Sequence, residues 1–256
     1  MKRLLVRLGF LVALVLAWQG LASAGLWNPV LMPPPSKVGA WLARSAQDGS
    51  LLAAALVTMR RLALGFGVGV AVGMPLGFLS ARFRGFDDTV GLLVRGIQSL
   101  PSVCWVPLAI LWFHLSEAAM LFVVVMGTVG SLAIATADGV RAVPPIYVRV
   151  ARTMGARGFA TWFRVILPAS LPFVVSGMKQ GWAFAWRSLM AAEIYVPVME
   201  SIGLGHLLHY GRELHAMEQV LGVIVVIVVV GVAIDRVLFS AAERAIHRRW
   251  GTGRSP

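Results

Sequence analysis

Apolar residues fill six stretches of the chain, and shorter segments rich in charge, Gly or Pro separate them. The stretches cover residues 4–24, 62–80, 90–113, 118–137, 172–192 and 220–239. The hydrocarbon core of a bilayer is roughly 30 Å thick, and about 20 helical residues are needed to cross it. The pattern therefore predicts an all-α polytopic membrane protein, with six transmembrane helices in a single domain that covers residues 1–256.

The connection between the fourth and fifth stretches, residues 141–171, is strongly basic. It contains no acidic residue and carries Arg141, Arg149, Arg152, Arg157 and Arg164. An Arg at the centre of a bilayer costs about 2.5–3.5 kcal/mol even on lenient insertion scales, so this connection must lie outside the hydrocarbon.

Local sequence also shapes this connection. It opens after Pro144-Pro145, which cannot continue a helix, and Gly155 and Gly158 allow a sharp turn in its middle. Apolar residues such as Met154 and Phe163 alternate with the arginines. We therefore expect a helix-turn-helix at the membrane surface, with exposed apolar side chains that indicate a partner.

Composition and charge agree with a membrane protein. Hydrophobic residues make up 58% and charged residues 13% of the 256 residues, and the mean hydropathy is +0.80. Soluble domains carry about 25% charged residues. The net charge of +12 comes mostly from residues before 8, at 82–84, at 141–164 and after 235. The positive-inside rule explains this charge better than nucleic-acid binding does, and it places both termini in the cytoplasm.

The first apolar stretch has two interpretations. Lys2, Arg3 and Arg7, the apolar residues that follow and Ala22-Ser23-Ala24 together resemble a cleavable signal peptide. In a chain with five further apolar stretches, an uncleaved first transmembrane helix is favoured.

Glycines recur every fourth residue in the second stretch, at Gly65, Gly69, Gly73 and Gly77. Such a row lies on one helix face and lets a neighbouring backbone approach closely, which matters where hydrophobic burial no longer drives association. The row predicts that this helix packs closely against another helix. Packing within one chain is favoured over a contact between two copies of the chain.

Polar residues interrupt the third and fifth stretches. Pro101 and Pro107 break the third, and broken membrane helices are tolerated where the freed backbone groups face protein or water. The residues predicted to line a path for an anionic or polar solute are Gln98, Ser102, Ser176, Lys179, Gln180 and Arg187. The alternative is that Lys179 snorkels to the interface and that Arg187 pairs with Glu193 or Glu200.

Two outer segments carry further candidates. A short amphipathic helix is expected from Ser36, as its N-cap, to about Gln47. His206 and His209 have a spacing compatible with metal, but without a third ligand they are interpreted as surface histidines. Cys104 is expected to be a small buried hydrophobe. No metal site, cofactor or catalytic residue set is predicted.

The basic connection resembles the cytoplasmic loop of ATP-binding-cassette (ABC) importer permeases. The family pattern is Glu-Ala-Ala, three residues, Gly, nine residues, Ile, one residue and Leu-Pro. Here the register reads Arg149-Val150-Ala151, Gly155, Val165 and Leu167-Pro168, so that Arg149 and Val150 replace Glu and Ala. Residues 31–36, 106–113 and 191–193 are most similar to the nitrate, sulfonate and taurine branch of this family.

The resemblance implies a permease subunit in the inner (plasma) membrane of a bacterial cell, importing nitrate, a sulfonate, taurine or a similar small anion. It implies contact with a separate ATPase subunit through Arg149, Val150, Ala151, Arg152, Thr153, Met154, Gly155 and Ala156, with Leu167 and Pro168 as the anchor at the membrane. It also implies an external solute-binding protein and a second copy of the chain in a homodimer.

The chain contains no GxxxxGK[ST] loop, so the resemblance leaves ATP hydrolysis to the partner. The alternative function is a stand-alone secondary carrier or channel. Such carriers often have inverted repeats and membrane-buried carboxylates, whereas the acidic residues of this chain lie mostly at the edges of its apolar stretches.

Overall fold

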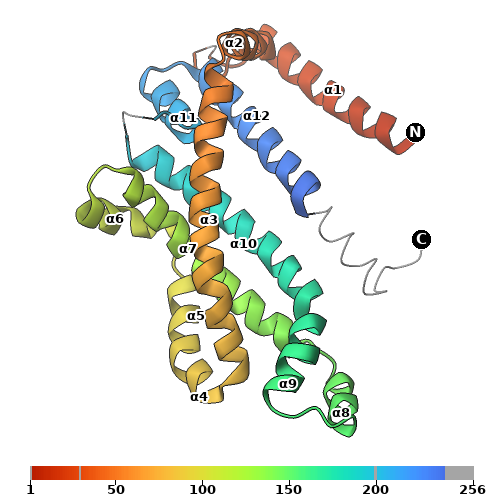
Figure 1. Cartoon of the computed structure of the whole chain (residues 1–256). Helices are drawn as coiled ribbons and strands as arrows, with labels where there is room; N and C mark the ends of the chain where they lie inside the picture. The colour runs from red at the N-terminus through yellow and green to blue at the C-terminus, as the bar shows by residue number, and fades with distance from the viewer. Residues whose placement is uncertain (1, 29, 199–200, 240–256) are drawn as a thin grey trace. The chain divides into compact units, whose positions relative to one another are not determined.

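Helices are the regular elements of the computed structural model, which describes residues 2–28, 30–198 and 201–239 (Figure 1). The described residues contain no strand, and the predicted all-α class is confirmed. Four helical runs are long and apolar enough to cross a membrane: Ser50–Arg82, Glu117–Arg141, Phe159–Tyr195 and Met217–Val237. A fifth crossing is possible if the bent pair Arg84–Gln98 and Ser102–Phe113 counts as one span. Helix α1 (Lys2–Ser23) offers a shorter apolar run, Gly9–Ser23.

The chain divides into two compact units: Met1–Thr58 with Pro197–Val230, and Met59–Val196 with Gly231–Pro256. The first unit contains α1, α2 (Pro35–Gln47), the start of α3 (Ser50–Arg82), α11 (Leu204–Glu213) and most of α12 (Met217–Ile234). In this unit Trp41 of α2 packs on Gly222 of α12. The expected N-cap at Ser36 is wrong: the N-cap is Pro34, because Pro35 fits the first helical turn, where no backbone N–H is needed.

The second unit is built around α7 (Glu117–Arg141), which packs along α10 (Leu167–Tyr195) and the rest of α3. The predicted glycine row of α3 lies against α7: a Cβ on each glycine would meet, in order, Val124, Thr128, Leu132 and Thr136. Gly177 and Gly181 of α10 receive Ala135 and Leu132 of α7 in the same way. Small residues thus let three long helices approach closely.

The third apolar stretch is broken, as its prolines predict. Helices α4 (Arg84–Phe86), η1 (Asp87–Gly91) and α5 (Leu92–Gln98) form one arm, and η2 (Ser102–Trp105) with α6 (Val106–Phe113) forms the other. The two arms meet at 98°. The break brings η2 to the surface, so Cys104 is exposed and its expected burial is wrong.

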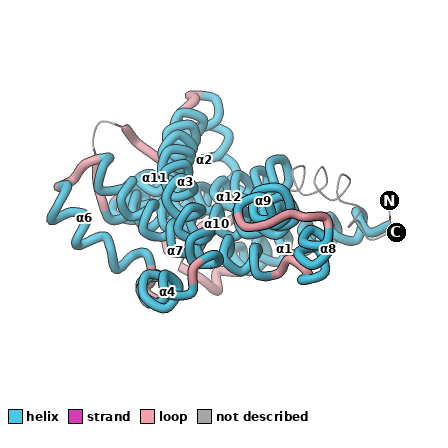
Figure 2. Tube along the Cα trace, turned by 60° about the horizontal axis from the view of Figure 1, so that its bottom comes forward, coloured by secondary structure: helices cyan, strands magenta, loops and turns pink. Residues whose placement is uncertain are grey.

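The basic connection forms what we call the elbow, residues 145–166, seen from its own end in Figure 2. It consists of α8 (Pro145–Thr153), α9 (Phe159–Thr161) and the π-helix η3 (Trp162–Ile166). Gly155 and Gly158 have φ of 85° and 55°, a left-handed region that favours glycine, and they make the turn between the arms. The second arm of the elbow, α9 with η3, continues into α10, so Leu167-Pro168 lies within the helical run Phe159–Tyr195. Within α10 itself, Pro168 lies in the first turn.

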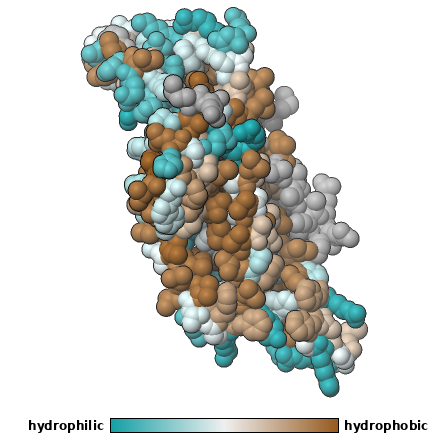
Figure 3. Space-filling view, turned by 60° about the vertical axis from the view of Figure 1, so that its left-hand side comes forward, coloured by the Kyte–Doolittle hydropathy of each residue, from teal (hydrophilic) through white to brown (hydrophobic). Residues whose placement is uncertain are grey.

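Hydrophobic residues, drawn in brown, cover much of the face that Figure 3 shows. In the long helices many large apolar side chains are exposed, for example Leu64, Val68 and Val72 of α3. Such a surface is suited to lipid.

Gly73→Ala tests the close packing of α3 on α7. The added Cβ would lie 2.7 Å from the backbone oxygen of Val129, which cannot move aside alone. Overpacking of this kind costs about 1–3 kcal/mol, so we expect a lower midpoint of thermal unfolding for the purified chain. Gly67→Ala is the matched control, because nothing lies within 4 Å of its Cβ. Equal midpoints for the two variants would contradict the packing.

Candidate functional site

A cavity of about 320 Å³ lies in the second unit, between the two arms of the broken third stretch and the helices α7 and α10. Its wall is formed by Gln98, Ser99, Leu100, Pro101, Ser102, Met126, Gly127, Phe184 and Arg187. We call it the solute cavity. It brings together three residues that the sequence nominated for a solute path, Gln98, Ser102 and Arg187.

Small residues of α7 make room for the polar wall. A Cβ on Gly130 would collide with the side chain of Gln98, and one on Gly127 would collide with Ser188 and crowd Ser102. Ser188 was not predicted: it is 1% exposed, and within the described chain its hydroxyl has no hydrogen-bond partner. It follows Arg187 directly, but the sequence pattern gave no reason to separate it from other helix serines.

Arg187 supplies the positive charge of the solute cavity. Its Nε donates a hydrogen bond to the carbonyl oxygen of Ala183 at 3.0 Å, and its guanidinium carbon lies 4.6 Å from the centre of the Phe184 ring. These two contacts hold the guanidinium on its own helix. No carboxylate pairs with it in the part of the chain that the structure describes. Its remaining N–H groups are therefore available to an anion.

The other nominated residues lie elsewhere. Ser176 and Gln180 line a second cavity of about 320 Å³, with Asp138 and Phe173 among its walls. Lys179 forms an ion pair with Asp235 of the π-helix η4 (Asp235–Phe239), with Nζ 3.1 Å from the carboxylate. The alternative pairing of Arg187 with Glu193 is wrong, because Glu193 binds Arg61 instead. Glu200 lies outside the described residues.

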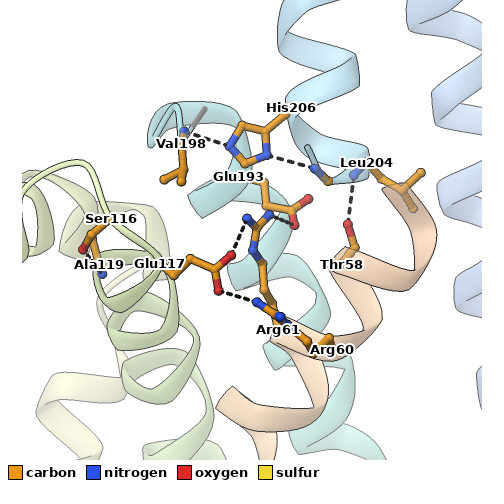
Figure 4. A network of polar contacts seen from close by, with 11 residues as sticks. Thr58, Arg60, Arg61, Ser116, Glu117, Ala119, Glu193, Val198, Leu204 and His206 are labelled. Atoms are coloured by element: carbon orange, nitrogen blue, oxygen red, sulfur yellow. Dashed lines mark hydrogen bonds and ion pairs between the residues drawn. The ribbon is translucent and has the colours of Figure 1, made fainter. Parts of the chain in front are cut away.

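A buried ion cluster holds α3, α7 and α10 together near the first turns of α7 (Figure 4). Arg61 of α3 donates to Glu193 at 2.9 Å and to Glu117 at 3.0 Å, and Arg60 donates to Glu117 at 2.8 Å. The side chains of Arg61 and Glu193 are fully buried, whereas that of Arg60 is 63% exposed. Both arginines precede the second apolar stretch of the sequence, but α3 begins at Ser50 and includes them.

The elbow presents an apolar tip flanked by arginines. Met154 is 81% exposed and Phe159 is 75% exposed, while Ala151 is buried. The backbone N–H of Ala156 donates to the carbonyl oxygen of Ala151, which closes α8 with Gly155 in the left-handed region.

A second group of charges connects the end of α7, just before the elbow, with the first arm of the broken third stretch (α4, η1 and α5). Asp87 of η1 pairs with Arg95 of α5 at 3.0 Å and with Arg141 of α7 at 2.7 Å. Arg141 also donates to the carbonyl oxygen of Ser80 in α3 at 3.1 Å. Because Arg141 ends the helix that leads into the elbow, this group connects the elbow to the arm that carries Gln98.

His206 lies in the first unit, in α11, the first helix after α10. His206 is fully buried, so its interpretation as a surface histidine is wrong. The backbone N–H groups of Val198 and Gly203 each lie 3.3 Å from one of its ring nitrogens (Figure 4), which accounts for a structural role in this segment. Across the described residues, no three His, Cys, Asp or Glu side chains come together in a way that could hold a metal ion.

The sequence model of one protein family, described as binding-protein-dependent transport system inner membrane component, matches residues 73–250. A putative ABC transporter permease protein of Methanocaldococcus jannaschii is 31% identical over 92% of this chain and 88% of its own length. The taurine transport system permease protein of Escherichia coli is 29% identical over 97% of this chain and 89% of its own. A bicarbonate transport system permease protein of Synechococcus elongatus is 28% identical over 77% of this chain and 70% of its own.

Among solved structures, a chain of the MetNI methionine ABC transporter in an inward-facing conformation superposes with a TM-score of 0.64. The match covers 74% of this chain and 92% of the other, at 18% sequence identity, and it supports the fold.

Arg61→Met tests the buried ion cluster. The substitution removes the arginine that pairs with the fully buried Glu193, and breaking a buried pair in this way costs about 3–5 kcal/mol. We therefore expect a large drop in the thermal unfolding midpoint. Arg60→Met is the control, since an exposed pair is worth at most about 1 kcal/mol. Removing both buried charges with Arg61→Met and Glu193→Gln should restore part of the loss. Similar midpoints for the Arg60 and Arg61 variants would exclude this account of the cluster.

Proposed function

The chain belongs to the family of binding-protein-dependent transport system inner membrane components, and from this premise we propose that its solute cavity passes a small anion through the membrane. The resemblance seen in the sequence to ABC importer permeases is thereby confirmed, and the chain is a transport subunit. The observation that carries the proposed substrate class is the cation of Arg187, which faces the solute cavity without a carboxylate partner among the described residues.

The chemistry of the solute cavity fits a singly charged oxyanion. Arg187 offers N–H groups in a planar fork that matches a carboxylate, sulfonate or similar group. Gln98 and Ser102, which also line the cavity, add an amide and a hydroxyl. A fixed positive charge lowers the free energy of dehydrating an anion, while a single cation binds weakly enough to allow release. Bicarbonate, named for one relative, belongs to this chemical class, and taurine, named for another, is a zwitterion that presents a sulfonate group.

Movement of the anion requires the cavity to open to one side of the membrane at a time. In the proposed mechanism, the elbow rests on a separate ATPase subunit through residues 149–156, and the exposed Met154 and Phe159 are covered there. ATP binding then favours one of two arrangements of the helices, because the ATPase contacts differ between them. A homodimer, an external solute-binding protein and cytoplasmic termini complete the proposed arrangement.

The charges around Asp87, with Arg95 and Arg141, connect the elbow to the solute cavity and would transmit movement between them. A displacement of the elbow moves Arg141 at the end of α7, and Arg141 holds Asp87 and the carbonyl oxygen of Ser80. Asp87 in turn holds Arg95, one turn before Gln98. The broken arm that lines the cavity is therefore tied to the segment that would receive force from the ATPase.

Arg187→Gln tests the substrate class. We expect uptake of the transported anion to fall by about tenfold or more while the chain still assembles with its ATPase, because only the cavity charge is lost. Arg187→Lys keeps the charge and should lose less. Arg236→Gln is the control, since it removes one exposed charge in η4 away from the solute cavity. Unchanged uptake by Arg187→Gln, measured with the cognate binding protein, would remove Arg187 from the path.

Gly155→Asp tests the elbow. A side chain at φ of 85° strains the turn and adds a negative charge to the proposed ATPase contact. Transport and copurification of the ATPase should both be lost, while membrane insertion remains. Gly49→Asp is a matched control, because Gly49 also has a positive φ, 75°, and open space around it, but it lies between α2 and α3. Uptake driven by this chain without any ATPase would instead favour a stand-alone carrier.

A further inference from the structure

Another cavity, lined by two arginines, lies where the elbow meets the end of α3. It shares no residue with the solute cavity. Its volume is about 280 Å³, and its wall is formed by Arg82, Val148, Arg152, Gly158, Thr161, Trp162 and Ile166. We call it the elbow pocket. Arg82 is the last residue of α3, whereas the other residues come from both arms of the elbow.

The elbow pocket holds two positive charges that nothing in the described chain neutralises. Arg82 lies over the ring of Phe83, with its guanidinium carbon 5.0 Å from the ring centre, and neither Arg82 nor Arg152 takes part in an ion pair among the described residues. No acidic residue occurs in the sequence between Asp138 and Glu193. Both arginine side chains are exposed, so water and salt screen their repulsion in part, and an anion between them would be attracted by both.

A buried polar group on the same wall points to the same need. Thr161 is 6% exposed, and its hydroxyl oxygen is buried without a hydrogen-bond partner in the described chain. A buried hydroxyl without a partner is unfavourable, because it has lost its hydrogen bonds to water and gained none. A ligand with several acceptor oxygens would satisfy this donor and both guanidinium groups at once.

We propose that the elbow pocket binds a phosphate group, supplied by the headgroup of an anionic phospholipid. Phosphate offers the acceptor geometry that two arginine forks match, and free phosphate would share this chemistry. The lipid source is favoured by position. Arg82 ends a helix long enough to span the membrane, and Trp162 on the wall is a residue type enriched at the headgroup level.

The proposal rests on the cytoplasmic placement of the elbow in the proposed function. Basic pockets between helices on that side of a membrane are suited to phosphate headgroups. The bound phosphate joins Arg82 of α3 to Arg152 of α8, and so fixes the base of the elbow against the membrane. In this arrangement Arg152 holds the phosphate, and the ATPase contact proposed for residues 149–156 is made by the tip around Met154.

The test measures binding of lipid to the purified full-length chain by native mass spectrometry, with dioleoyl-phosphatidylglycerol, dioleoyl-phosphatidylcholine and inorganic phosphate as probes. Arg82→Gln with Arg152→Gln removes both pocket charges. Arg149→Gln with Arg157→Gln is the matched control, because it removes two elbow charges that do not line the pocket. Thr161→Val, with an unchanged circular dichroism spectrum, replaces only the hydroxyl by a methyl group of similar size.

Phosphatidylglycerol should bind the unmodified chain more tightly than phosphatidylcholine does. Its affinity should fall about tenfold or more in the pocket variant, about threefold in Thr161→Val and less than twofold in the control. If millimolar inorganic phosphate displaces phosphatidylglycerol, and the variants rank in the same order for phosphate binding, the pocket is a phosphate site whose ligand is the free ion.

Equal losses in the pocket variant and the control would overturn the proposal. Loss of the copurified ATPase from the pocket variant, with lipid binding unchanged, would also overturn it and assign the pocket to a protein carboxylate. Because lipid binding is measured without transport, its failure is distinct from failure of the anion-uptake test at Arg187.

Discussion

Close approach between helix backbones is the constraint on which the second unit depends. Apolar side chains are as well solvated by lipid as by one another, so burial alone does not bring membrane helices together. Here the glycines of α3 and α10 receive side chains of α7, and glycines on α7 itself receive Gln98 and Ser188. Of these glycines, Gly127 also lines the solute cavity, so close packing and the cavity meet at this residue of α7.

The charged residues of this unit occur in two different arrangements, one paired with opposite charge and one not. Arg61 and Glu193 are both fully buried and neutralise each other, with Glu117 sharing the cluster, so they fix three helices without offering a charge to a ligand. Arg187, by contrast, is held only by Ala183 and Phe184 of its own helix within the described chain. The first arrangement is suited to holding a structure, and the second to binding something that enters and leaves.

Local features could be predicted from the sequence because they act within a few residues. Pro101 breaks the third stretch, Pro144-Pro145 begins the elbow and Gly155 turns it, whatever the surrounding fold. Partners far apart in the chain could not be predicted. Arg61 and Glu193 are 132 residues apart, and helix periodicity does not specify which acidic residue a buried arginine will meet. The burial of His206 depends in the same way on how segments fold back on one another.

The continuity of the second arm of the elbow with α10 has a mechanical consequence. From Phe159 to Tyr195 the chain forms a single helical run, in which Arg187 lies 28 residues beyond the arm's first residue. At about 1.5 Å per residue, this places the two positions roughly 40 Å apart along one rod. Such a rod would act as a lever with the Arg187 charge near its far end. In the proposed mechanism, a small tilt imposed at the elbow would be magnified there, with the π-helical turn at Trp162–Ile166 and Pro172 as the points where the helix can bend.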